Sequence, residues 1–423
     1  MWFALFLLAF LPVQWSISIG DGFEVPLFRL GAILLLFWFG AVILVSHRSV
    51  KFPLPILLPL VGFLGITLIG ALWLGIPAEH WFRKYLFLAG LLPLSLVWQA
   101  LLSRSRGLSL VQASLLGALA SAILGMGIFV SQFLFGVGEV MAWLTQSLLP
   151  WFLGERLGNL VASFPSLLVN IGGETWLRLT AFFPDPHVAA FFFGMSSFLS
   201  FGLWLETSKK FWAWTGGFLL LSTLLTFSRG GYFGLLAGGV VFIGLLIKGR
   251  GRSFRVILTI GLLPILLWFS SPAIERFISS FTLEDASSVE RLSLWQTAGI
   301  TWQAHPWFGV GLGQYAEHIH PFVGDRLPYY AHNLFLDLGV EVGIVGLTFF
   351  LALIFLAWMS ALHKAWQRPG LALGVLAALT FYLIYSLFET ALFSLHVTAL
   401  LTLVIALAYR DKDYAEPKTP HEE

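Results

Sequence analysis

The sequence predicts an all-α polytopic membrane protein with about twelve transmembrane helices, and three observations support this fold class. First, 58% of its 423 residues are hydrophobic and only 11% are charged, whereas soluble domains carry about 25% charged residues. Second, apolar runs of roughly 20 residues, which span a bilayer core about 30 Å thick, recur along almost the whole chain. Third, basic residues gather in alternate connections, as they do across a membrane. We therefore expect 1–423 to form a single transmembrane domain.

The expected helices are apolar runs bounded by polar residues or by Gly and Pro. They lie near 1–17, 27–46, 55–75, 85–102, 108–134, 188–206, 211–227, 232–247, 256–270, 333–358, 371–388 and 391–409. The first run lacks the basic start and the small-residue cleavage site of a signal peptide, so we expect it to remain as the first helix. Because this run is short and the pair around Ser228 is tightly joined, eleven to thirteen helices would also fit.

The placement of lysine and arginine predicts the orientation. One set of alternate connections, which includes Lys209, Lys210 and Lys364, holds most of the 24 basic residues, although the opposite side has the longer loops. Because short cytoplasmic loops are enriched in Lys and Arg, both termini are expected in the cytoplasm. Two long segments, 135–187 and 271–332, then face outward, and neither has the charge-rich composition of a disordered linker.

Four polar groups stand out at the outer ends of the expected helices. A charge near the apolar part of a membrane costs a few kcal/mol unless it is paired or hydrated, so each is a functional hypothesis. Three arginines on this face could bind one phosphate or pyrophosphate through bidentate hydrogen bonds. The alternative for each arginine is contact with lipid headgroups or with a local carboxylate. The groups are Arg178 with Asp185, Arg229, Arg291, and His332 with Asn333.

His332 is the candidate base, because an imidazole takes up a proton near neutral pH. It precedes the helix expected at 333–358, and it would suit activation of an acceptor hydroxyl. The alternative is an interfacial histidine that binds lipid or caps the helix together with Asn333. Asp337 and Glu341 follow on the same helix and could share its face. Both buried hydrogen-bonded carboxylates and a proton relay remain open for them.

The sequence does not favour a metal site, a cofactor or nucleic acid. It has no cysteine, and His318 and His320 have no partner carboxylate at a recognisable spacing. The run Gly309–Gly313 resembles a nucleotide loop but lacks a surrounding βαβ unit, so a tight turn is expected there. A net charge of +2 gives no argument for nucleic-acid binding.

Several stretches, taken in order, resemble the O-antigen ligase and O-antigen polymerase superfamily over about 175–350. His187 stands where this family usually has Asn. The stretches are Arg178 followed by Asp185-Pro186-His187, the turn Thr226-Phe227-Ser228-Arg229-Gly230, the loop residues Arg291, Trp295, Pro306 and Gly309–Gly313, and His332-Asn333-Leu334-Phe335-Leu336 followed by Glu341-Val342-Gly343-Ile344-Val345-Gly346-Leu347.

This resemblance implies a glycosyltransferase of the C type in the bacterial inner membrane, active at the periplasmic face. Its donor would be a glycan on undecaprenyl pyrophosphate, and its acceptor would be the lipid A-core, a growing glycan or a protein. Arg178, Arg229 and Arg291 would hold the pyrophosphate, and His332 would orient or deprotonate the acceptor hydroxyl. Asp185, Asn333 and Glu341 would belong to the substrate-binding part. Because arginines can hold a pyrophosphate without a divalent cation, the expected enzyme is metal-independent.

Two other classes compete with the transferase. A transporter or flippase would also have about twelve helices and intramembrane carboxylates, but it is expected to show related halves and broken helices. The polar residues gather instead at the outer ends and in two asymmetric long segments. A structural membrane subunit would not need three arginines and a histidine at those positions. The transferase is therefore the favoured hypothesis, and the sequence does not separate a ligase from a polymerase.

Overall fold

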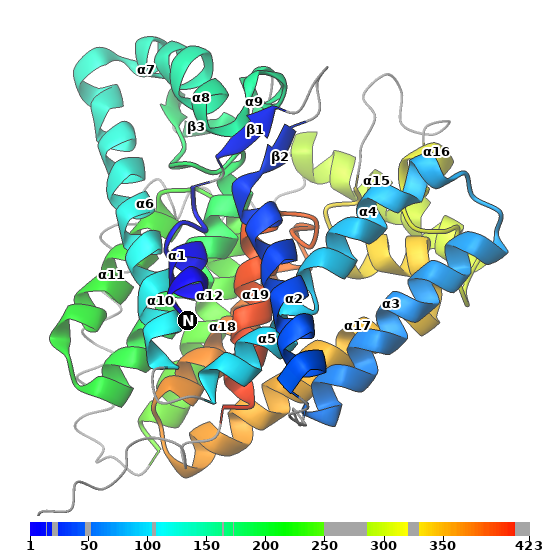
Figure 1. Cartoon of the computed structure of the whole chain (residues 1–423). Helices are drawn as coiled ribbons and strands as arrows, with labels where there is room; N and C mark the ends of the chain where they lie inside the picture. Colours follow the sequence, from blue (N-terminus) through cyan, green and yellow to red (C-terminus); the bar gives the residue numbers. More distant parts are fainter. Residues whose placement is uncertain are drawn as a thin grey trace, which may run out of the picture.

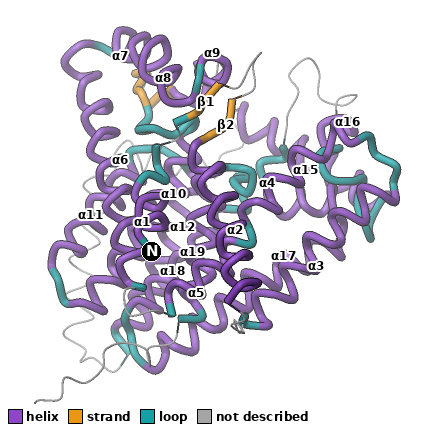
Figure 2. The backbone as a smooth tube through the Cα atoms, in the orientation of Figure 1, coloured by secondary structure: helices purple, strands orange, loops and turns teal. Residues whose placement is uncertain are grey.

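The computed structural model describes residues 1–13, 15–18, 24–46, 52–103, 107–162, 165–171, 173–248, 286–319 and 330–410. In this part of the chain, seven helical segments are long and apolar enough to cross a membrane, so the protein is an all-α polytopic membrane protein (Figure 2). The segments are α2 (Leu27–Ser46), α3 (Leu54–Trp73), the pair α4 (Ala78–Leu91) and α5 (Leu94–Leu102), α6 (Leu108–Phe135), α10 (Pro186–Thr207), α12 (Arg229–Leu246) and α17 (Leu334–Gln367).

Three further helices in the bundle are shorter than a full span. They are α11 (Lys210–Leu224), α18 (Leu371–Tyr385) and α19 (Leu395–Ala408). The helix expected at 256–270 lies outside the described residues. The count of about twelve transmembrane helices therefore stays a prediction.

The expectation of a spanning helix at 1–17 is wrong. Helix α1 (Trp2–Ala9) has eight residues and is only about 12 Å long. The chain then forms strand β1 (Ser16–Ser18), which pairs antiparallel with β2 (Glu24–Pro26). The run expected at 85–102 is also different, because α4 starts seven residues earlier and Pro93 separates it from α5. Proline lacks the N–H that a continuous helix needs.

Most of the segment 135–187, which is expected to face outward, folds into short elements at one end of the bundle. Figure 1 shows them at the top, beside the β1–β2 hairpin. The elements are α7 (Val137–Trp143), a π-helical turn (Leu144–Leu148), α8 (Leu149–Leu153), α9 (Glu155–Ala162), a 3-10 turn (Pro165–Leu167) and the antiparallel strands β3 (Leu168–Ile171) and β4 (Glu174–Leu177). Trp15 and Trp151 tie this end to the hairpin, with ring centroids 5.2 Å apart.

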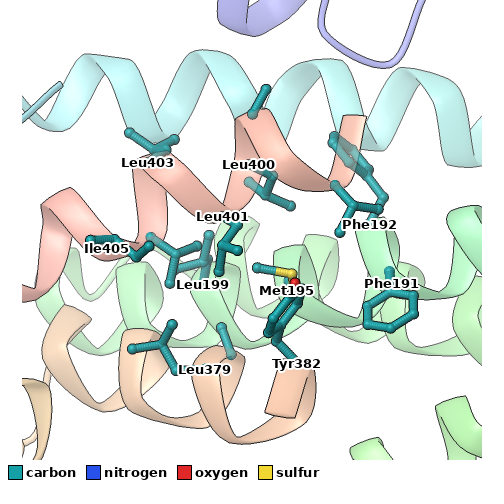
Figure 3. Close-up of a cluster of buried hydrophobic side chains, with 14 of the residues drawn as sticks. Phe191, Phe192, Met195, Leu199, Leu379, Tyr382, Leu400, Leu401, Leu403 and Ile405 are labelled. Carbon is teal, nitrogen blue, oxygen red and sulfur yellow. The ribbon is translucent and has the colours of Figure 1, made fainter. Parts of the chain in front are cut away.

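The buried core lies where α10, α18 and α19 meet. Figure 3 shows Phe191, Met195 and Leu199 of α10 facing Tyr382 of α18 and Leu401 of α19, and all five side chains are fully buried. Helices pack closely in membranes where small residues meet. A Cβ atom on Gly202 of α10 would lie 2.8 Å from Cα of Gly374 on α18, so this crossing requires glycine on both helices.

Helix α17 is broken at Gly343, which has φ 64° and ψ −174°. The connection between α15 (Ala286–Ala304) and α16 (Tyr315–Ile319) inserts at this break. Val310 N–H donates to the Val340 carbonyl at 2.8 Å, and Ile344 N–H donates to the Pro306 carbonyl at 2.8 Å. The backbone groups released by the break are thus satisfied by another segment, as buried irregular backbone in a membrane protein must be.

The glycine-rich run is therefore more than the tight turn expected from the sequence. Gly309, Gly311 and Gly313 all have positive φ, a conformation that glycine adopts without steric cost. Gly311 N–H donates to the Glu341 carbonyl at 2.9 Å. The run pairs with the broken helix along its backbone, and this pairing sets the position of α15 against α17.

Candidate functional site

His332 and Glu389 form the centre of the site. His332 lies just before α17, and Glu389 lies in the turn between α18 and α19. Leu334 N–H donates to the Ser386 carbonyl at 2.9 Å, which joins the two segments. Nδ1 of His332 is 2.8 Å from Oε1 of Glu389. The backbone of His332 has φ 53°, a strained value for a residue with a side chain.

The Glu389 carboxylate determines which nitrogen of the His332 ring carries the proton. An ionised Glu389 only accepts hydrogen bonds, so in neutral His332 the proton is assigned to Nδ1 and Nε2 keeps its lone pair. No described residue hydrogen-bonds to Nε2, and 41% of the His332 side chain is exposed. Nε2 is therefore the ring atom that can accept a proton.

The charges in this pair stabilise each other. The negative charge of Glu389 raises the pKa of His332 above its ordinary value, and this effect exceeds the opposing effect of burial. Burial by itself raises the pKa of Glu389, but the neighbouring cationic groups, His332 foremost, outweigh burial and hold the pKa well below its usual range. A neighbouring opposite charge favours the ionised form, so Glu389 stays an anion that supports a positive imidazole.

Arg291 contacts the same turn from α15. Its Nη1 donates to the Phe388 carbonyl at 2.8 Å, and its Nη2 lies 3.5 Å from Oε2 of Glu389. The sequence placed Arg291 and His332 among the candidate residues, and the structure brings them together on one carboxylate. The Arg291 side chain remains 29% exposed.

Asp337 fastens the two segments that carry His332 and Glu389. Its Oδ1 accepts from Ala331 N–H at 2.7 Å, and its Oδ2 accepts from the hydroxyl of Thr390. Asp337 is buried, so the expectation of a buried carboxylate with hydrogen-bond partners is confirmed for it. Asn333 caps α17, because its Oδ1 accepts from the N–H groups of Phe335 and Leu336 at 3.0 and 3.2 Å. The side-chain oxygen of Asn333 therefore acts as the N-cap of α17.

A second group of polar residues adjoins Glu389 at the start of α10. Nδ1 of His187 lies 3.0 Å from Oγ of Ser228 and 3.2 Å from the hydroxyl of Tyr385. It also lies 3.9 Å from Oε2 of Glu389. The hydroxyls of Ser228 and Tyr385 contact each other. His187 therefore joins the Asp-Pro-His stretch and the Ser-Arg-Gly turn to the carboxylate of Glu389.

Asp185 and Arg178 hold this second group in place. Asp185 caps α10, since its Oδ1 accepts from His187 N–H at 2.6 Å and its Oδ2 accepts from the Ser166 hydroxyl at 2.7 Å. Arg178 is buried. Its Nε donates to the Thr226 carbonyl at 2.6 Å and its Nη1 donates to the Ser166 carbonyl at 2.8 Å. Nη2 of Arg178 has no hydrogen-bond partner in the described part of the chain.

Arg229 is the first residue of α12 and is half-buried. Its neighbour Gly230 packs against the turn that carries Glu389, because a Cβ atom there would lie 2.7 Å from the Tyr385 ring and 2.8 Å from Cβ of Phe388. The start of α12 therefore borders the same turn that Arg291 contacts.

Glu341 is placed differently from the other candidates. Its Oε1 lies 2.6 Å from Nζ of Lys84 on α4, and its side chain is almost fully buried. Sequence reasoning missed Lys84 as its partner, and it missed Glu389 altogether. The available signal for Glu389 was a carboxylate in a short connection between two apolar helices, which is costly unless it is paired.

Among the described residues, no group of three or more His, Asp or Glu side chains is arranged to hold a metal ion. His305 and His318 lie near each other, with ring centroids 6.4 Å apart, while His320 lies outside the described residues.

Comparison with protein families gives a match to the middle of the chain. No curated protein matches the chain. A family model described as O-antigen ligase matches residues 214–351, a range that contains Arg229, Arg291, His332, Asn333 and Glu341 and leaves out Arg178, Asp185 and Glu389. Over this region the chain is similar to the O-antigen ligase family.

Proposed function

We propose that this protein transfers a glycan from undecaprenyl pyrophosphate to an acceptor hydroxyl, with the lipid A-core as the acceptor. The observation that supports this most directly is the hydrogen bond from Nδ1 of His332 to Glu389 at 2.8 Å, which leaves Nε2 as an oriented base. Arg291 bonds to the same carboxylate, so a base and a cation for the leaving group lie side by side.

In the proposed reaction, the acceptor oxygen attacks the anomeric carbon of the donor sugar. Nε2 of His332 takes the hydroxyl proton, a new C–O glycosidic bond forms, and the bond between the sugar and the pyrophosphate oxygen breaks. The bonding pair leaves with undecaprenyl pyrophosphate. Glu389 stabilises the imidazolium that forms, as a carboxylate does when it orients a catalytic histidine.

The three arginines would stabilise the negative charge on the leaving group. Arg291 donates to the Phe388 carbonyl, and Gly230, the neighbour of Arg229, packs against Phe388. Arg178 keeps Nη2 without a partner among the described residues. Planar guanidinium groups suit phosphate oxygens because they donate two parallel hydrogen bonds. Because guanidinium groups supply this positive charge, the proposal includes no divalent metal.

The topology is part of the same proposal. About twelve helices would cross the inner membrane, both termini would be cytoplasmic, and 135–187 and 271–332 would face the periplasm in the manner of a C-type glycosyltransferase. The supporting observation is that His332 and Asp185 lie directly at the starts of α17 and α10, and that Arg291 lies in the second turn of α15. A polymerase that uses a growing glycan as its acceptor would have the same donor and the same base.

A transporter or flippase is the alternative from a different class, and one observation favours it. Transporters commonly contain broken helices, and α17 is broken at Gly343, contrary to the expectation from the sequence. The break is filled by the 306–311 segment, whose backbone bonds to both halves of α17. A transport site would instead leave such backbone groups open to a cavity, so the transferase remains the better proposal.

The test is transfer by purified protein, given an undecaprenyl-pyrophosphate glycan and either lipid A-core or a second glycan as acceptor. We expect product with lipid A-core, and His332→Ala is expected to lose at least about 100-fold in rate, the usual contribution of a general base. Product only with a second glycan would make the protein a polymerase. If folded protein releases no undecaprenyl pyrophosphate with either acceptor, both activities are contradicted. Transport assays would then test the transporter alternative.

A further inference from the structure

A basic residue of the N-terminal half reaches the loops that carry the proposed catalytic pair. Lys84 lies on α4, far from the matched range 214–351. Its Nζ is 2.6 Å from Oε1 of Glu341, and 24% of its side chain is exposed. Glu341 belongs to α17, so this ion pair connects α4 to the helix that follows His332.

Lys84 also lies over a pair of stacked rings. Its Nζ is 5.1 Å from the ring centroid of Tyr330 and 4.7 Å from that of Phe393. The two rings are 5.8 Å apart and inclined by 13°. A cation within about 6 Å of an aromatic ring is attracted by the ring's negative face, so one ammonium group stabilises both rings at once.

The two rings belong to the two segments that must meet at the site. Tyr330 precedes His332, and Phe393 follows Glu389 in the turn between α18 and α19. Asp337 fastens the same two segments at a second point, through Ala331 N–H and the Thr390 hydroxyl. The His332–Glu389 hydrogen bond is therefore supported by these two contacts and by the hydrogen bond from Leu334 N–H to the Ser386 carbonyl. Of these three, only the aromatic contact involves a residue outside the C-terminal half.

We propose that Lys84 is a positioning residue for the His332–Glu389 pair. It keeps Tyr330 stacked on Phe393, and the stacked rings fix the distance between the two segments. His332 has a positive φ, a conformation that persists only where the surroundings hold it, so the loop needs such a tie. This proposal rests on the proposed function, because it concerns the rate of the same transfer.

The simpler role for Lys84 is neutralisation of Glu341, and a pair of variants separates the two roles. Lys84→Met keeps an unbranched apolar side chain but leaves the Glu341 carboxylate buried without its cation, which by itself can damage folding. The double variant Lys84→Met/Glu341→Gln removes that stranded charge. If neutralisation is the only role, the double variant should recover the wild-type rate.

The experiment measures kcat and KM for the acceptor with purified wild-type protein and four variants. We expect the double variant to lose about tenfold in kcat with little change in KM, because a small misplacement of catalytic groups costs rate more than binding. Lys84→Arg should keep most of the rate, since arginine also lies over aromatic rings. Arg83→Gln, the same change of charge at the exposed neighbour, should match wild type.

Recovery of the wild-type kcat in the double variant, or a Lys84→Met variant as fast as wild type, would overturn the proposal. A rise in KM with unchanged kcat would also overturn it, because that result indicates substrate binding by Lys84. If wild-type protein transfers no glycan, the proposed function fails. If wild type transfers glycan and the variants match it, only the role of Lys84 fails.

Discussion

Oε1 of Glu389 accepts a hydrogen bond from Nδ1 of His332 at 2.8 Å, across 57 residues of sequence. The same carboxylate lies 3.5 Å from Nη2 of Arg291 through its other oxygen. One buried anion thus orients the proposed base and holds an arginine beside it. Because Glu389 stays charged, it stabilises the imidazolium form of His332 more than the neutral form.

The first prediction concerns pH. Glu389→Gln should lower the pKa of His332, because the charge that raises it is removed. The base form of His332 exists above its pKa, so the acidic limb of the kcat profile should move to lower pH. The plateau rate should also fall by at least about tenfold, since the imidazolium loses its counter-charge.

This prediction is checked by pH profiles of transfer for wild type, Glu389→Gln and the control Glu317→Gln. Glu317 is exposed on α16, so its profile should coincide with that of wild type. An acidic limb that stays in place or moves to higher pH in Glu389→Gln would show that Glu389 does not set the pKa of the catalytic group.

The second prediction concerns Arg229. Arg229→Ala should abolish transfer while the protein stays folded, because the side chain is half-buried at the start of α12 and its proposed role is to bind the pyrophosphate. Arg229→Lys should recover only part of the rate, since an ammonium cannot donate two parallel hydrogen bonds. Transfer rates and thermal unfolding of the purified variants are the measurements.

Arg368→Ala is the control for Arg229, because Arg368 is exposed at the far end of α17. Full activity of Arg229→Ala would remove Arg229 from the site. Loss of the folded state in Arg229→Ala would assign the residue to stability instead. The activity of the Arg229→Lys variant would then show whether transfer needs only a positive charge or the two parallel donors of a guanidinium group.

The third prediction concerns Asn333. Its Oδ1 caps α17, so Asn333→Ala should lose about 1 kcal/mol of stability, while Asn333→Asp should keep the cap. If Asn333 instead binds the anionic donor, Asp at this position should repel it and raise the donor KM. Thermal unfolding and donor KM of both variants separate the two roles. An Asn333→Ala variant as stable as wild type would contradict the capping role, and a stable Asp variant with a raised donor KM would assign donor binding to Asn333 as well.

The parts of the fold that sequence could predict are those set by local pattern. Apolar runs predicted α2 and α6 to within one residue at each end. These two runs are long enough to span the bilayer, and a run of that length and hydrophobicity indicates a membrane helix. The first run was predicted too long. Hydrophobicity alone does not distinguish a spanning helix from α1 followed by strand β1, whose partner β2 sets its conformation.

Sequence could predict those site residues whose side-chain chemistry is unusual beside an apolar run. Arg291 and His332 stood out as polar groups beside apolar runs, and the structure places both on Glu389. Glu389 itself was missed because its partners lie 57 and 98 residues away in sequence, and no spacing rule connects them. Glu341 was placed near His332 by helical periodicity, but its contact with Lys84 on α4 is tertiary and lies beyond any local pattern.

The last prediction concerns the break in α17. Gly343 has φ 64°, and a Cβ atom there would lie 2.2 Å from the Trp307 carbonyl oxygen. Gly343→Ala must therefore adopt an unfavourable backbone and displace the inserted 306–311 segment. We expect a loss of at least about 2 kcal/mol of stability, the sum of backbone strain and a steric clash.

Gly239→Ala is the matched control, because Gly239 lies inside α12 with no atom near its missing Cβ. Alanine favours a helix over glycine by about 1 kcal/mol, so this variant should be as stable as wild type or more so. Thermal unfolding of both variants in the same detergent decides the matter. Equal stability of Gly343→Ala and wild type would mean that the 306–311 segment can move aside. Its contact with α17 would then not fix the position of α15, the helix that carries Arg291.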